Sequence, residues 1–212
     1  MNSTHEKTES RTQWSAAWER ALPYLALVGP GSWLIAALVR AAGIGTLEGG
    51  LGWVSRPEGF IMTIGAPFFV ATFIFMGQRL AERSVRTGIA VTVLGILGVA
   101  PLAAVSGFRL FAAAFTDAGI DPNTINQAFE AESVWYLGVL VLNLGQFLAW
   151  IIAGIAILRT DIAAKWAGVA LILGVPSVII AQALYFNLEV FWPLGTGLWL
   201  IGVWGLVASR DN

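Results

Sequence analysis

Asn143 and Gln146 are the only side-chain amides in a long apolar stretch, Val134–Leu158, which has 25 residues and no charge or proline. Because residues three apart share a face of an α-helix, both amides are expected on one face near the middle of the stretch. That face should point into a bundle of helices, since a polar side chain exposed to lipid is costly. Two roles fit. The amides either hydrogen-bond between helices and fix their packing, at about 1 kcal/mol or less per bond, or line a path for a small solute or a site for a lipid headgroup.

A second group of polar residues occurs where apolar stretches end. Arg40 and Arg109 end the first and third stretches, and Glu189 follows the fifth. If the stretches alternate in direction across a membrane, all three lie at one level, and Glu189 would form a partly buried ion pair with Arg40 or Arg109. The alternative is that the long arginine side chains extend from the helix ends to water and have no further role. Gln182, in the fifth stretch, is a third amide of the candidate polar lining.

No pattern typical of a catalytic or metal site occurs in the sequence. The chain has no cysteine, its single histidine is His5 in a polar segment, and its two lysines, Lys7 and Lys165, lie in polar segments or at the edge of a stretch. Thiolate and histidine metal sites, axial-histidine haem and a retinal-type Schiff base are therefore excluded. The acids of 117–132 lack the spacing and the central glycine of an EF-hand calcium loop. We expect no enzyme activity, no metal and no cofactor.

The composition is that of a membrane protein. Of the 212 residues, 57% are hydrophobic and 12% are charged, and the mean hydropathy is +0.75. Soluble domains are about 25% charged. The net charge of −1 offers no basic surface of the kind that nucleic-acid binding requires. The expected partners are membrane lipid and other membrane proteins, either further copies of this chain or a larger complex, and no nucleic acid.

Six apolar stretches predict six transmembrane helices, since about 20 apolar residues cross a hydrocarbon layer about 30 Å thick. We place them at 22–39, 60–78, 88–108, 134–158, 164–186 and 190–208. Together they form one all-α domain, 22–209, a polytopic membrane helix bundle. Residues 1–21 form a polar tail, in which 13–22 predict either a short helix lying in the membrane interface or an extension of the first span. Prolines inside four stretches are expected to kink their helices; they are Pro30, Pro67, Pro101 and Pro176.

The distribution of lysine and arginine predicts the orientation of the bundle. With both termini inside the cell, nine of these residues lie on the cytoplasmic side and three on the outer side. Positive residues concentrate in cytoplasmic loops of membrane proteins, so the bias predicts that both termini are cytoplasmic. The loop at 110–133 agrees, because it has four acids and no lysine or arginine.

Two connections are longer than a bundle of this kind needs. The glycine-rich connection 41–59 is either a surface loop or a re-entrant segment that carries Glu48 partly into the membrane. In 110–133, Asp121 and Pro122 are typical of the N-cap and first position of a helix. A short amphipathic helix is therefore expected from about Pro122.

The second half of the chain resembles a broad set of uncharacterised bacterial six-helix integral membrane proteins. The likeness covers about 134–209 and rests on the turn Arg159–Gly168, R-T-D-I-A-A-K-W-A-G, and on a final span with proline, glycine and tryptophan. It implies a multi-pass protein of the bacterial cytoplasmic (inner) membrane, and it transfers no site residue. The expected function is that of a non-enzymatic membrane protein that binds a small solute or lipid, or of a subunit of a larger complex. The alternative is a small transporter or channel protomer that works as an oligomer.

Overall fold

The computed structural model describes residues 2–52, 54–131, 133–183 and 191–210, and these residues form helices joined by short loops. Side chains are described for most of them, but not for 2–14, 50, 129–131, 133–137, 139–140 and 182–183. Within the described ranges there are eight α-helices and no strand, so the all-α fold class is confirmed. The helices are α1 (Asn2–Ala41), α2 (Arg56–Gly65), α3 (Phe68–Ala81), α4 (Val85–Asp117), α5 (Pro122–Ala131), α6 (Ser133–Arg159), α7 (Lys165–Ala183) and α8 (Phe191–Ala208), with a short 3₁₀ turn, η1 (Gly49–Leu51), between α1 and α2.

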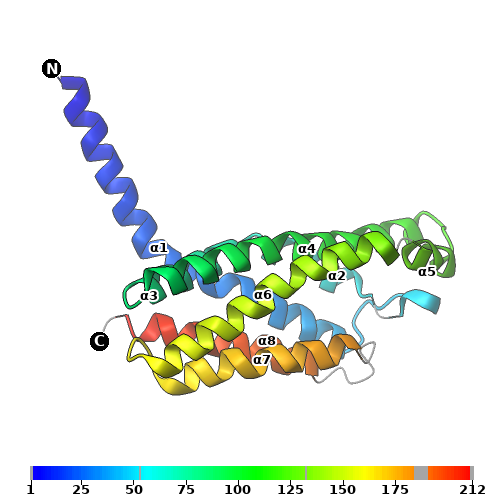
Figure 1. The fold of residues 1–212 in the computed structure, drawn as a ribbon. Coiled ribbons are helices and arrows are strands. Elements are labelled where there is room, and N and C mark those ends of the chain that lie inside the picture. Colours follow the sequence, from blue (N-terminus) through cyan, green and yellow to red (C-terminus); the bar gives the residue numbers. More distant parts are fainter. Residues whose placement is uncertain (1, 53, 132, 184–190, 211–212) are drawn as a thin grey trace.

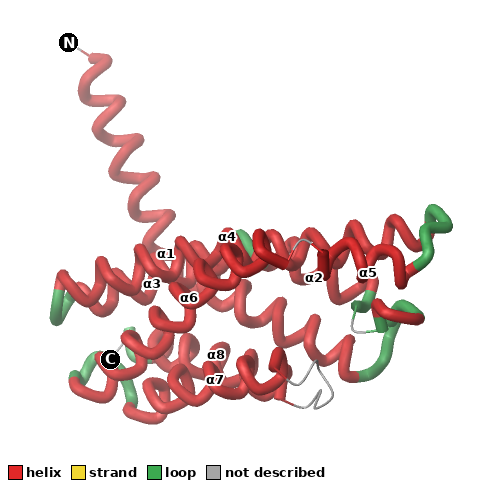
Figure 2. The backbone as a smooth tube through the Cα atoms, turned by 45° about the vertical axis from the view of Figure 1, so that its right-hand side comes forward, coloured by secondary structure: helices red, strands yellow, loops and turns green. Residues whose placement is uncertain are grey.

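The long helices lie alongside one another (Figure 1), and their contacts form a closed ring. Along the chain α1, the pair α2–α3, α4, α6, α7 and α8 each pack on the next, and α8 packs back on α1. The loops gather at the two ends of this bundle (Figure 2). Helix α1 runs without interruption from Asn2, and its first turns project from the same end of the bundle at which α8 finishes (Figure 1).

The number of membrane spans is four to five by the length and hydropathy of the described helices. Four helical segments are long and apolar enough to cross a membrane, and they are Ser15–Ala41, Val85–Asp117, Val141–Arg159 and Phe191–Ala208. The pair α2–α3 adds a fifth if it is counted as one span, although its two helices are bent by 43° at the break before Phe68. Pro67 lies in that break, and proline disrupts a helix because it lacks a backbone N–H. The fifth expected span, 164–186, corresponds to α7, whose described apolar part, Lys165–Ala181, is shorter than these segments.

Side-chain caps fix where three of the helices begin. Ser55 and Glu58 form a capping box at the start of α2, in which each side chain accepts a hydrogen bond from the other residue's backbone N–H. Ser84 caps α4 by accepting from the N–H of Thr87. Asp121 accepts from the N–H of Thr124 at 3.2 Å. The predicted helix from Pro122, with Asp121 as its N-cap, is therefore confirmed.

The connection between α1 and α2 covers one end of the bundle together with α5. An isolated antiparallel bridge joins Thr46 to Ser55, and η1 packs on α5. A small apolar cluster holds this cap in place; it consists of Leu47, Leu51, Val54, Ala112, Ala113 and Ile125. Glu48 is exposed. The described residues of this connection, 42–52 and 54–55, thus lie at the end of the bundle (Figure 1).

Five aromatic rings from four helices fill the centre of the ring of helices. Trp33, Phe69, Phe73, Trp150 and Trp199 are each at most 2% exposed. Successive centroids lie close together: 5.3 Å from Trp33 to Phe69, 6.4 Å from Phe69 to Phe73 and 5.0 Å from Phe73 to Trp150. Trp150 then stacks on Trp199 at 5.0 Å. Aromatic contacts of this kind stabilise a core by more than the burial of apolar surface alone. At the level of these five rings, side chains fill the middle of the bundle.

Candidate functional site

A fully buried ion pair joins α2 to α4. Arg109 donates a hydrogen bond from Nη1 to Oε1 of Glu58 at 2.6 Å, and the two side chains are 2% and 0% exposed. The other carboxylate oxygen of Glu58 accepts from the backbone N–H of Ser55 at 3.2 Å, within the capping box. The guanidinium carbon of Arg109 also lies 5.9 Å from the ring centroid of Trp192. Because both charges are removed from water, each is stabilised mainly by the other, and loss of one partner is costly.

This pair differs from the one that the sequence suggested for Arg109. Glu58 was not a candidate, because it belongs to the connection 41–59 and lies 51 residues from Arg109. The signal that pointed to it is the spacing Ser55-x-x-Glu58, a capping-box pattern just before an apolar run. Arg40 is buried at the end of α1. Glu189 lies outside the described residues, so its pairing with either arginine stays a prediction.

The two central amides lie side by side on α6 and are buried. Asn143 and Gln146 are 8% and 1% exposed. The side-chain N–H of Gln146 donates to Oδ1 of Asn143, and Gln146 packs against Gly98 of α4. Among the described residues, Oε1 of Gln146 has no hydrogen-bond partner. This hydrogen bond stays within α6 and does not join two helices.

Gln182, the third amide of the candidate lining, belongs to α7. Its side chain lies outside the described part of the structure, so its relation to Asn143 and Gln146 remains a prediction. The structure therefore brings together two of the three candidate amides, Asn143 and Gln146.

Replacing both Asn143 and Gln146 by leucine is expected to change the free energy of unfolding by less than about 1 kcal/mol, because removing both partners of a hydrogen bond is nearly neutral. Asn143→Leu alone should cost more, since it leaves the buried amide N–H of Gln146 without its acceptor. Unfolding of the wild-type protein and of these two variants in mixed micelles, as the fraction of denaturing detergent rises, measures the difference. A double variant less stable than Asn143→Leu would contradict this assignment.

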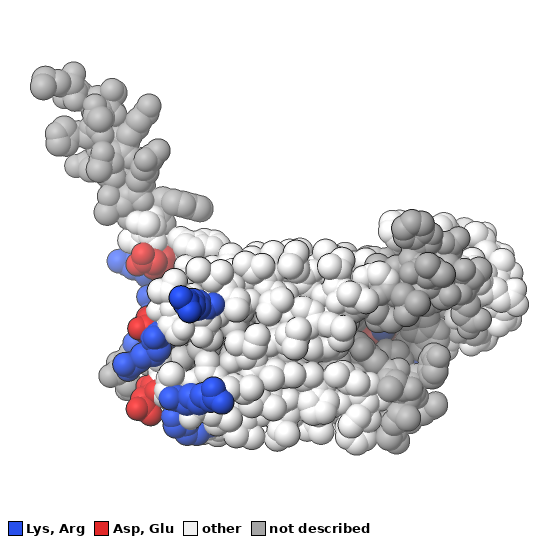
Figure 3. Space-filling view, viewed as in Figure 1, with Lys and Arg blue, Asp and Glu red and all other residues white. Residues whose placement is uncertain are grey.

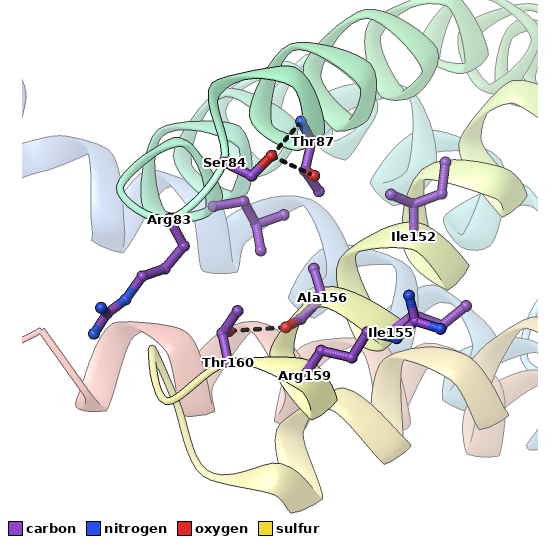
Figure 4. A pocket seen from close by; sticks show the side chains of 9 residues that line it. Arg83, Ser84, Thr87, Ile152, Ile155, Ala156, Arg159 and Thr160 are labelled. Carbon is purple, nitrogen blue, oxygen red and sulfur yellow. Dashed lines mark hydrogen bonds between the residues drawn. The ribbon is translucent and has the colours of Figure 1, made fainter.

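An open pocket, drawn in Figure 4, lies on the flank of the bundle, toward the end from which α1 projects in Figure 1. It lies between the turn that joins α3 to α4 and the last turns of α6, and it has a volume of about 300 Å³. Its rim has two exposed arginines, Arg83 and Arg159, from opposite walls. Hydroxyl groups and apolar side chains complete the lining, namely Ser84, Thr87 and Thr160, and Leu80, Ile152, Ile155 and Ala156.

Basic side chains gather around this pocket. In Figure 3, lysine and arginine atoms collect at the end of the bundle from which α1 projects, with a smaller number of aspartate and glutamate atoms among them, while the described surface along the middle of the bundle is uncharged. Arg79, Arg83 and Arg86 flank the α3–α4 turn, and Arg159 and Lys165 flank the turn from α6 to α7. The pocket is thus located where the bundle passes from an apolar surface to a basic one.

Neither a matching family nor a metal centre among the described residues indicates the function of this chain. Among the described residues, no group of three or more His, Cys, Asp or Glu side chains is arranged to hold a metal ion. Comparisons with protein-family models, with curated proteins and with solved structures give no match to this chain. The features of the described residues that bear on function are the buried ion pair, the central amides and the flank pocket.

Proposed function

We propose that this chain is a six-span protein of a bacterial cytoplasmic membrane that works by binding lipid or a small solute and not by catalysis. The count of six takes α2–α3 as one broken span and α7 as a span of its own. Both termini are cytoplasmic in this proposal. Its support is the nine-to-three distribution of lysine and arginine along the chain, together with the gathering of basic side chains at one end of the bundle.

One observation favours binding at the flank over passage through the middle. The five core rings fill the centre of the bundle, with neighbouring centroids 5.0–6.4 Å apart. The flank pocket, by contrast, is open and combines an apolar lining with basic residues. Such a combination of apolar surface and a few polar groups is the usual composition of a ligand site. A lipid molecule beside the bundle has direct access to it.

The second candidate function is that of a transporter or channel protomer, and a row of buried polar atoms favours it. In the described residues the indole N–H groups of Trp33, Trp150 and Trp199 and Oε1 of Gln146 have no hydrogen-bond partners. Trp150 follows Gln146 by four residues, so both share one face of α6. A small polar solute within the core would satisfy these groups, but the aromatic rings must first move apart.

Native mass spectrometry of the gently solubilised protein tests the proposed function. We expect the folded chain to retain adducts with the mass of membrane lipid, because the open flank pocket has both apolar and basic walls. Loss of all adducts under conditions that keep the fold would contradict a lipid-binding role. Stoichiometric binding of a different protein chain would instead support a subunit of a larger complex.

A further inference from the structure

We propose that the flank pocket recognises the phosphate of an anionic phospholipid, with Arg83 and Arg159 as the two residues that neutralise its charge. This inference rests on the proposed lipid-binding function and specifies the class of lipid. Basic pockets between transmembrane helices on the cytoplasmic side are suited to anionic headgroups. Arginine suits phosphate in particular, because its planar guanidinium group donates two parallel hydrogen bonds.

Both arginines are available for a ligand because the neighbouring acids are engaged elsewhere. Glu82, beside Arg83, accepts two hydrogen bonds from Arg79, at 2.7 and 2.9 Å. Asp161, near Arg159, lies 3.3 Å from the ammonium group of Lys165. Within the described part of the chain, Arg83 and Arg159 form neither an ion pair nor a hydrogen bond through their side chains.

The start of α4 adds neutral donors to the same wall of the pocket. Ser84 is the N-cap of this 33-residue helix, and the N-terminus of a helix attracts anions. The hydroxyl oxygen of Ser84 accepts from the backbone N–H of Thr87 at 3.4 Å and from its hydroxyl at 3.0 Å. Its own O–H donates to no described residue, so it is a third donor for a phosphate oxygen.

The apolar lining favours a lipid over free phosphate as the natural ligand. Leu80, Ile152, Ile155 and Ala156 form the apolar part of the lining. An inorganic phosphate ion gains nothing from this surface, whereas the glycerol and upper acyl segments of a lipid would cover it. The volume of about 300 Å³ is at the lower end of the range for ligand sites, about 300–1,000 Å³, so it holds a headgroup region and leaves the acyl chains in the bilayer.

Binding requires the two guanidinium groups to turn toward each other. In Figure 4 the two side chains leave from opposite walls of the pocket, and their guanidinium groups point to different sides of it. Both side chains are exposed, and exposed side chains change rotamer within nanoseconds. A bound phosphate would therefore draw both guanidinium groups toward itself and so complete the site.

The test measures binding of phosphatidylglycerol to the full-length protein in phosphatidylcholine nanodiscs or mild detergent, by native mass spectrometry and lipid titration. Arg83→Gln and Arg159→Gln should each weaken phosphatidylglycerol binding about fivefold, and the double variant about 25-fold. Arg86→Gln is the matched control, because Arg86 is exposed on the first turn of α4 but does not line the pocket. It should change binding less than about twofold, and phosphatidylcholine adducts should be unaffected in all four variants.

Four results would overturn the inference. Equal weakening by Arg86→Gln would mean that anionic lipid is attracted by the whole basic end and not by the pocket. Inorganic phosphate binding that depends on both arginines, without phosphatidylglycerol binding, would assign the pocket to a soluble anion. Phosphatidylglycerol and phosphatidylcholine retained equally by all variants would remove the headgroup selectivity while leaving lipid binding intact. Loss of all lipid from the folded wild-type protein would instead contradict the proposed function itself.

Discussion

Arg109→Met is expected to lower the free energy of unfolding by about 3–5 kcal/mol, because it leaves the buried carboxylate of Glu58 without its charge partner. The two groups are 2.6 Å apart and almost completely buried, at 2% and 0% exposed. Water cannot compensate for the lost arginine unless the contact between α2 and α4 opens. Unfolding in mixed micelles with a rising fraction of denaturing detergent measures the loss.

An exposed ion pair in the same protein is the matched control for this prediction. Nη2 of Arg56 lies 2.5 Å from Oδ1 of Asp117, and the two side chains are 44% and 60% exposed. Arg56→Gln should cost less than about 1 kcal/mol, because water and salt screen an exposed pair. The double variant Glu58→Gln/Arg109→Met should recover much of the stability lost in Arg109→Met, since no buried charge remains. Similar losses for Arg109→Met and Arg56→Gln would show that the α2–α4 pair is hydrated.

Gly98→Ala is expected to destabilise the protein by about 1–3 kcal/mol, the usual cost of overpacking a well-packed contact. A Cβ atom at Gly98 would lie 2.5 Å from Cβ of Gln146 and 2.6 Å from its backbone nitrogen. Because the second contact is with backbone, α4 and α6 must move apart to accept even one methyl group. Such close approach is what small residues provide between membrane helices.

Gly107→Ala, in the same helix, is the control for Gly98→Ala. A Cβ atom at Gly107 meets nothing within 4 Å, so the substitution should be neutral or should stabilise α4 by up to about 1 kcal/mol through better helix propensity. The two variants differ only in their neighbours. Equal effects of both would mean that helix propensity, and not the α4–α6 contact, determines the result.

The helices were predictable where apolar runs are long, and their ends were predictable only where a local signal exists. Asp121 and Pro122 mark the start of α5, as the N-cap pattern indicates. The third expected span was placed at 88–108, beside Arg109, whereas the helix that contains it, α4, continues to Asp117. A charge normally ends a span. Here Glu58 neutralises it inside the bundle, and a contact between residues 51 positions apart is not visible in a local pattern.

The candidate sites, like the helix ends, were predictable only where the signal is local in the sequence. Asn143 and Gln146 were found from their position in one helix, because a spacing of three is a local property. The flank pocket was not found, since Arg83 and Arg159 belong to turns far apart in the chain. In the sequence both arginines contribute only to the count of cytoplasmic charges. Their location at one pocket follows from the packing of α6 beside α4.

The central claim, that the chain spans a membrane six times with its basic end in the cytoplasm, is tested most directly by thiol labelling. The chain has no cysteine, so Arg83→Cys and Thr124→Cys each introduce a single reporter, one at each end of the bundle. In intact cells an impermeant thiol reagent should label the variant at Thr124 and should label the variant at Arg83 only after the membrane is opened. Labelling of both variants from the same side would contradict the six-span arrangement and the assignment of the pocket to the cytoplasmic leaflet.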